Sequence, residues 1–324
     1  MRYTVSHLFQ KNRRPLVAAR HYYASPRTFQ QSDKSEEEYD ARELMRRHMQ
    51  ALKLSRSYEP IPYDASFPIV PVNDPPGKQE HKKVSIVGAG QVGMAIAYSI
   101  LNQMSAGTIA LVDQNAEKLL GEAKDLEQGS GFHENVRVLA SNQYGVTSNS
   151  DLVIVTAGAA QRPGESRLNL LERNVSIMQS IIPPVLSQSP DATICIVSNP
   201  CDIMTAVANK IAGQSVPPGR IFGSGTCLDS SRLQSLLAKT LEIDARSVSG
   251  YVVGEHGDHS VALWSSVRIG GIPMLHPGDE PTEIHKNMHR EVIDSAYDVI
   301  LRKGYTNWAV GLTGAYIAKG KHNI

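Results

Sequence analysis

The stretch Val84-Ser85-Ile86-Val87-Gly88-Ala89-Gly90-Gln91-Val92-Gly93 decides the fold of this chain. Its apolar start predicts a short buried strand, and residues 94–104 after it have helical character. A strand, a glycine turn and a helix in this order form the dinucleotide-binding fingerprint, in which the helix N-terminus faces the phosphates. The first glycine permits the tight turn, the second lets the backbone approach the pyrophosphate, and the third lets helix pack on strand. We therefore expect cofactor contacts from Gly88, Gly90, Gln91, Val92 and Gly93.

A second expected strand, residues 108–112, ends in Asp113, twenty residues after Gly93. A carboxylate at this place can accept hydrogen bonds from both ribose hydroxyls and would repel a 2′-phosphate, which favours NAD over NADP. Lys118, a little further on, is a candidate for contact with the adenosine. The alternative for Lys118 is a solvated lysine on the face of a helix.

Strands and helices continue to alternate along the chain. We expect strands at 136–139, 152–155 and 192–197 and a helix at about 168–186. This alternation is typical of an α/β protein with a Rossmann-type doubly wound parallel sheet. Ligands of such sheets bind at the carboxyl ends of the strands, which here carry Gly158, Ala159, Val197 and Asn199.

Three polar residues in the second half of the chain indicate acid–base chemistry. Asp229 and Arg232 stand three apart in an expected helix, and His256 lies in the stretch Gly254-Glu255-His256-Gly257-Asp258. An isolated Asp–Arg pair is most often a surface ion pair. Together with the histidine, however, Arg232 would bind a substrate carboxylate bidentately and Asp229 would orient His256. His256 would then exchange a proton with the substrate oxygen, since imidazole titrates near neutral pH.

These motifs, in this order, make residues 83 to about 318 resemble the lactate/malate dehydrogenase family, and within it the NAD-dependent L-lactate dehydrogenases. The resemblance implies a second, α+β substrate domain. It also implies that Asn199 contacts both nicotinamide and substrate, that Thr306 lines the substrate pocket, and that Ser224 belongs to the cofactor contacts.

The loop 158–167 is similar to the mobile lid of this family. Closure of such a loop would exclude water and bring Arg167 over the substrate carbonyl, where a guanidinium stabilises developing alkoxide charge. An ordinary surface loop is the alternative.

Gln161 is the residue that discriminates between substrates. Malate-specific relatives place an arginine two positions before the Pro-Gly pair, and here that position holds Gln161, with Arg162 in the next position. A neutral amide suits the methyl group of pyruvate and cannot form a bidentate ion pair with the second carboxylate of oxaloacetate.

The N-terminal region differs from the rest in composition. Residues 1–32 contain six basic and no acidic residues, which predicts a mitochondrial transit peptide, with a basic tail in a cytoplasmic protein as the alternative. Residues 33–81 predict a helix, 35–54, with a capping box at Ser35 and Glu38, followed by a proline-rich linker. We expect the NAD-binding domain at 82–223 and the catalytic domain at 224–324. The family continues beyond the position of Ile324, so we expect that domain to be C-terminally incomplete.

Composition excludes several other functions. The net charge of +1 gives no indication of nucleic-acid or membrane binding, and the three cysteines lack metal-site or disulfide spacing. Most of the eleven histidines need no function. His285 and His289, four apart, have the spacing of zinc ligands, but without a third ligand we expect a solvated helix face and no metal.

The sequence thus predicts an oxidoreductase that transfers hydride reversibly between NAD and (S)-lactate or pyruvate. We expect a small 2-hydroxy or 2-oxo acid as substrate and a homo-oligomer, dimer or tetramer, as in the family. Two alternatives stay open: a dehydrogenase for malate or another 2-hydroxy acid, and a truncated NAD-binding protein with little activity.

Overall fold

The computed structural model describes residues 82–320 except 104, 133–135, 160–166 and 276–277. The expected transit peptide, N-terminal helix and proline-rich linker lie outside the described residues, as do Gln161, most of the expected lid and the side chain of Arg167.

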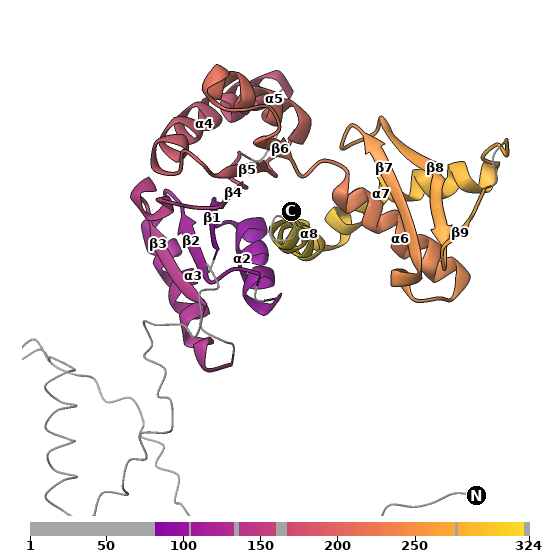
Figure 1. The fold of residues 1–324 in the computed structure, drawn as a ribbon, viewed down its shortest axis with the longest axis horizontal. Coiled ribbons are helices and arrows are strands. Elements are labelled where there is room, and N and C mark those ends of the chain that lie inside the picture. Colours follow the sequence, from indigo (N-terminus) through magenta and orange to yellow (C-terminus); the bar gives the residue numbers. More distant parts are fainter. Residues whose placement is uncertain (1–81, 104, 133–135, 160–166, 276–277, 321–324) are drawn as a thin grey trace, which may run out of the picture. The chain divides into compact units, whose positions relative to one another are not determined.

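The first half of the described chain builds one six-stranded parallel sheet (Figure 1). Its strands, in the spatial order β3-β2-β1-β4-β5-β6, are Arg137–Ser141, Thr108–Val112, Lys83–Val87, Leu152–Val155, Thr193–Ile196 and Ile221–Gly223. The strands β2 and β3 are added on one side of β1, and β4, β5 and β6 are added on its other side. The strand order therefore reverses between β1 and β4, and ligands of such sheets bind at this switch point. The prediction of a doubly wound sheet is confirmed.

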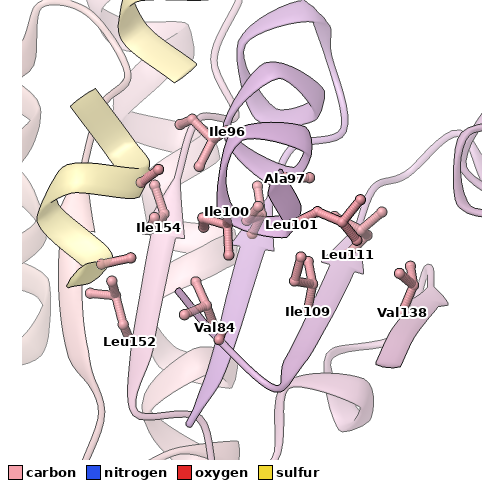
Figure 2. Packing of buried hydrophobic residues seen from close by; sticks show 14 of the residues in the cluster. Val84, Ile96, Ala97, Ile100, Leu101, Ile109, Leu111, Val138, Leu152 and Ile154 are labelled. Carbon is pink, nitrogen blue, oxygen red and sulfur yellow. The ribbon is translucent and has the colours of Figure 1, made fainter. Parts of the chain in front are cut away.

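Helices cover both faces of this sheet. On one face, α2 (Gln91–Gln103) places Ile96, Ala97, Ile100 and Leu101 over the apolar side chains of the strands, as Figure 2 shows. On the other face, α4 (Arg167–Gln188) and α5 (Cys201–Ala212) bury a second cluster that includes Met178 and Met204. Strands buried on both sides explain why the expected strands are nearly continuous apolar runs.

The second half of the chain forms an α+β unit with its own core. An antiparallel sheet, β7-β8-β9 (Val248–Gly254, Ser260–Ile269 and Ile272–Pro273), packs with α6 (Cys227–Leu241) and α7 (Glu283–Lys303). Its buried cluster contains Leu233, Leu237, Val252, Trp264, Val267 and Val292.

The last helix, α8 (Trp308–Gly320), packs against α2 of the first half. A methyl group on Gly311 would stand 2.6 Å from the Ala95 carbonyl oxygen, so only glycine permits this approach. Ala315 and Ala318 join the core around α2. The C-terminal end of the described chain therefore helps to close the first core.

Helix α2 begins three residues earlier than the residue 94 expected from the sequence. Gly93 consequently lies inside its first turn. The helix starts directly after the glycine turn, so its free N–H groups lie next to that turn.

Candidate active site

The glycine turn between β1 and α2 is shaped by close backbone contacts. Gly88 has φ +104°, and a Cβ built on it would stand 2.6 Å from the Ala157 backbone nitrogen, after β4. A Cβ on Gly93 would stand 1.9 Å from the Gly88 carbonyl oxygen. A Cβ on Gly90 would meet no atom within 4 Å. Two glycines thus let the chain fold tightly, while the third keeps the space above the helix N-terminus clear.

Asp113, at the end of β2, is tied to this turn. Its Oδ2 accepts a hydrogen bond from the Ala89 backbone N–H at 2.7 Å, and its Oδ1 accepts one from the Asn115 N–H at 2.9 Å. A carboxylate offers about four acceptor positions, so ribose hydroxyls can still bind.

Two cavities lie along the carboxyl ends of the strands. The first, of about 440 Å³, is lined by Gly88, Gly90, Asp113 and Gly158 among the expected cofactor residues. The second, of about 400 Å³, is lined by further expected residues, namely Val92, Gly158, Ala159, Val197, Asn199, Ser224, Arg232, His256 and Thr306. Thr156 and Gly158 line both cavities, so the two spaces meet at the end of β4.

Asp229, in the first turn of α6, is the centre of a three-residue arrangement, and its two partners, Arg232 and His256, line the second cavity. Its Oδ2 lies 2.6 Å from Nδ1 of His256, and its Oδ1 accepts a hydrogen bond of 2.8 Å from Nη1 of Arg232. The Asp229 side chain is 8% exposed and that of Arg232 is 16% exposed. This burial excludes the solvated surface ion pair that an isolated Asp–Arg spacing would suggest.

Comparison with known proteins agrees with this geometry. Residues 82–223 match the lactate/malate dehydrogenase NAD-binding domain, and residues 226–321 match the alpha/beta C-terminal domain of the same enzymes. L-lactate dehydrogenase B of Hordeum vulgare is 50% identical over 242 residues, which are 73% of this chain and 70% of that protein. The L-lactate dehydrogenase B chain of Rattus norvegicus is 48% identical over 76% of this chain and 75% of its own. The chain belongs to the lactate/malate dehydrogenase family.

As a member of this family, the protein uses NAD, and its first cavity fits the adenosine and diphosphate parts of that cofactor. The open space at Gly90 and the N–H groups of the first turn of α2 suit a diphosphate. Asp113 at the end of the neighbouring strand suits the ribose. Lys118 does not belong to the lining of either cavity; it is an exposed helix residue whose Nζ lies 3.8 Å from Glu122.

The charges around His256 shift the pKa values in opposite directions. The hydrogen bond with Asp229 raises the pKa of His256 above 6.5, although burial and Arg232 oppose this shift. Burial alone would raise the pKa of Asp229, but the hydrogen bond and charge of His256, together with Arg232, lower it below its ordinary value. The pair therefore favours an imidazolium beside a carboxylate. If Nδ1 donates to Asp229, Nε2 is the atom free to exchange a proton in the cavity.

Two residues near the site were missed by the sequence analysis. Asp202, at the start of α5, accepts the backbone N–H of His256 through Oδ2 at 2.8 Å. Asn174, in α4, is buried and bonds to the backbone of both Ala159 and Asn199. Asp202 lies only three residues after Asn199, and this proximity was the one available signal for it. Asn174 carried none, because a buried asparagine in a helix has no distinguishing pattern.

The expectation of a solvated face at His285 and His289 is wrong for His285. His285 is 8% exposed, stacks edge-on against Trp264 with ring centroids 4.7 Å apart, and accepts the Thr282 N–H through Nδ1. It therefore caps α7 and fills the core beneath β8. His289 is half-buried next to the Ser260 hydroxyl. Among the described residues, no group of three potential ligands is placed to hold a metal ion.

The described part of the chain contains no helix with the length and apolar character needed to cross a membrane. Cys195 and Cys201 are buried free thiols, and Cys227 is half-buried and also free.

Proposed function

We propose that this protein is an NAD-dependent L-lactate dehydrogenase that interconverts pyruvate and (S)-lactate. The observation that supports this most directly is that His256, paired with Asp229, and Arg232 line a cavity that meets the NAD cavity. The relatives with about half of their residues identical, from plants and a mammal, are L-lactate dehydrogenases.

In this proposal, Arg232 binds the substrate carboxylate through the donors that Asp229 leaves free, since a guanidinium has five N–H groups. The bound carboxylate fixes the carbonyl carbon of pyruvate between Asn199 and His256, which line the same cavity. Thr306 lines the wall of that cavity and limits the size of the substrate.

Reduction of pyruvate needs a hydride at carbon and a proton at oxygen. NADH, when bound, supplies the hydride to the carbonyl carbon. His256 donates the proton from Nε2 to the carbonyl oxygen, and Asp229 stabilises the imidazolium before the transfer. Arg167, at the start of α4, would stabilise the charge on that oxygen. In lactate oxidation, neutral His256 takes the proton back.

We also propose that the protein acts on the pyruvate of glycolysis as a homotetramer in mitochondria. The basic, acid-free residues 1–32 support the location, and the tetramer is proposed by analogy with the family. Import of the full chain into isolated mitochondria, with a variant lacking residues 1–32 as control, tests the location. Light scattering of the purified protein tests the assembly.

The substrate is tested by NADH oxidation with pyruvate and oxaloacetate side by side. We expect higher kcat/KM for pyruvate, and a reversed or strongly reduced preference in Gln161→Arg, since the new guanidinium would pair with the second carboxylate. An oxaloacetate preference in the unmodified protein would make it a malate dehydrogenase. Intact NADH binding with no turnover of either acid would support an NAD-binding protein with little activity.

A further inference from the structure

Asn174 is a buried residue that connects two loops of the active site, the one that contains Ala159 and the one that contains Asn199. It lies on α4, seven residues after Arg167, and is 1% exposed. Its Oδ1 accepts the backbone N–H of Ala159 at 2.8 Å, and its Nδ2 donates to the backbone carbonyl of Asn199 at 3.2 Å. One buried amide thus joins the segment after β4 to the segment after β5.

The orientation of this amide follows from its two partners. A backbone N–H can only donate, so it must face the oxygen of the Asn174 side chain. A backbone carbonyl can only accept, so it must face the nitrogen. Asparagine is therefore matched to the position, because aspartate, leucine and alanine each lose at least one of these functions.

Both partners of Asn174 line the cavity that contains His256 and Arg232. Asn174 also packs beneath Gly158, since a Cβ built on Gly158 would make ordinary van der Waals contacts with the Asn174 oxygen at 3.6 Å and with Ser198 Cβ at 3.5 Å. A substitution at Asn174 would consequently shift the cavity-lining backbone of Ala159 and Asn199, although Asn174 itself does not line the cavity.

We infer that Asn174 is a positioning residue for the reaction, because it fixes the backbones of Ala159 and Asn199 relative to each other. This inference rests on the proposed function for its kinetic part, in which Asn199 contacts the nicotinamide and the substrate. Its structural part, the linkage of the two loops, can be measured without turnover.

Two substitutions separate the two hydrogen bonds. Asn174→Ala removes both, and we expect kcat for pyruvate to fall on the order of tenfold to a hundredfold, the range for leaving buried backbone groups unpaired. Asn174→Asp keeps an acceptor for Ala159 but, when ionised, sets an oxygen against the Asn199 carbonyl. Hydrogen exchange at the Ala159 amide should therefore quicken in the alanine variant and stay slow in the aspartate variant. Both variants should lose kcat and change the fluorescence of bound NADH, while NADH affinity changes little because the glycine turn and Asp113 are intact.

Ser189→Ala is the matched control. Ser189 is also 1% exposed and also joins two backbone groups, at Ser150 and Thr147, outside both cavities. We expect it to lower the melting temperature while leaving kcat, KM and the fluorescence of bound NADH unchanged. The inference is overturned if folded Asn174→Ala behaves like this control, with a lower melting temperature alone. If the unmodified protein turns over no 2-oxo acid, the proposed function fails, whereas altered Ala159 exchange and NADH fluorescence would still support the linkage.

Discussion

The two halves of the molecule build their parts of the active site in different ways. The nucleotide-binding half uses the backbone of contiguous segments. At its key positions, Gly88, Gly90 and Gly93, the absence of a Cβ atom is what matters. The catalytic half uses side chains from distant parts of the chain: Asp229 is 27 residues and Asp202 is 54 residues from His256. The first part should therefore be sensitive to added volume, and the second to the loss of a charge or a proton.

The largest effect should follow from removing the proton donor of the catalytic half. His256→Asn keeps a polar side chain of similar reach but cannot exchange a proton near neutral pH. We expect kcat for pyruvate to fall by about 10²–10⁴, the usual contribution of general acid–base catalysis. Steady-state kinetics would measure kcat, which reports on the catalytic half, and a fluorescence titration would measure NADH affinity, which reports on the nucleotide-binding half.

The same variant should bind NADH almost as well as the unmodified protein, because the glycine turn and Asp113 line the first cavity, which His256 does not line. Turnover that survives in His256→Asn would contradict the assignment of the acid–base residue. A parallel loss of NADH affinity would contradict the inference that the two halves contribute separately to turnover and to cofactor binding.

An intermediate effect should follow from adding one methyl group in the nucleotide-binding half. The Cβ of Gly93→Ala would stand 1.9 Å from the Gly88 carbonyl oxygen, so the turn or the helix must shift. We expect a loss of about 1–3 kcal/mol in the free energy of unfolding, as for other overpacked sites, and a loss of NADH binding. Chemical denaturation and NADH titration measure the two effects.

Gly90→Ala is the matched comparison, because its Cβ would meet no protein atom within 4 Å. Its stability should change by less than about 0.5 kcal/mol, the usual range at uncrowded sites, while NADH affinity falls because the methyl group occupies the space for the diphosphate. Equal destabilisation by the two substitutions would mean that steric contact is not what requires glycine at position 93.

This difference between the halves also explains how far the sequence was informative. The parallel sheet and its turn were predictable because local apolar runs and nearby glycines determine them. The strand at 108–112 was placed without error, and the helix 167–188 was placed within two residues at each end, although it contains Pro183 and Pro184. The His256 arrangement was predicted from the chemistry of its three residues together with the family resemblance, since no local rule brings residues 229 and 256 together.

The residues that the sequence analysis missed or misjudged depend on tertiary contacts. Asp202 and Asn174 act on backbone groups of distant loops, and the periodicity of α5 or α4 does not show this. His285 is on the face of α7 that meets Trp264, whereas a solvated face was expected because His285 and His289 lacked a third metal ligand. Helix amphipathicity locates a buried face only approximately, so a polar residue at its border can be placed wrongly.

The smallest effect concerns the pH dependence of the catalytic half. His256 must carry its proton to reduce pyruvate, and the hydrogen bond with Asp229 raises its pKa above 6.5. Pyruvate reduction should therefore persist above that pH and fall as the pH rises through the raised pKa. Asp229→Asn removes the negative charge, so burial, which lowers the pKa of His256, then prevails. We expect the falling limb of kcat/KM to move to lower pH by about one unit, a change of about 1.4 kcal/mol.

Asp202→Asn is the sharpest comparison for this shift. Its amide oxygen can still accept the His256 N–H, so the loop keeps its anchor, but the smallest of the charges that act on His256 is lost. The falling limb of the pH profile of kcat/KM should move in the same direction as in Asp229→Asn, but by much less. The catalytic half would then depend on one charged contact at Nδ1, and the second carboxylate would serve mainly to hold the backbone. Equal shifts in the two variants would instead mean that His256 responds to the total negative charge around it, and that its hydrogen bond with Asp229 has no special role in setting its pKa.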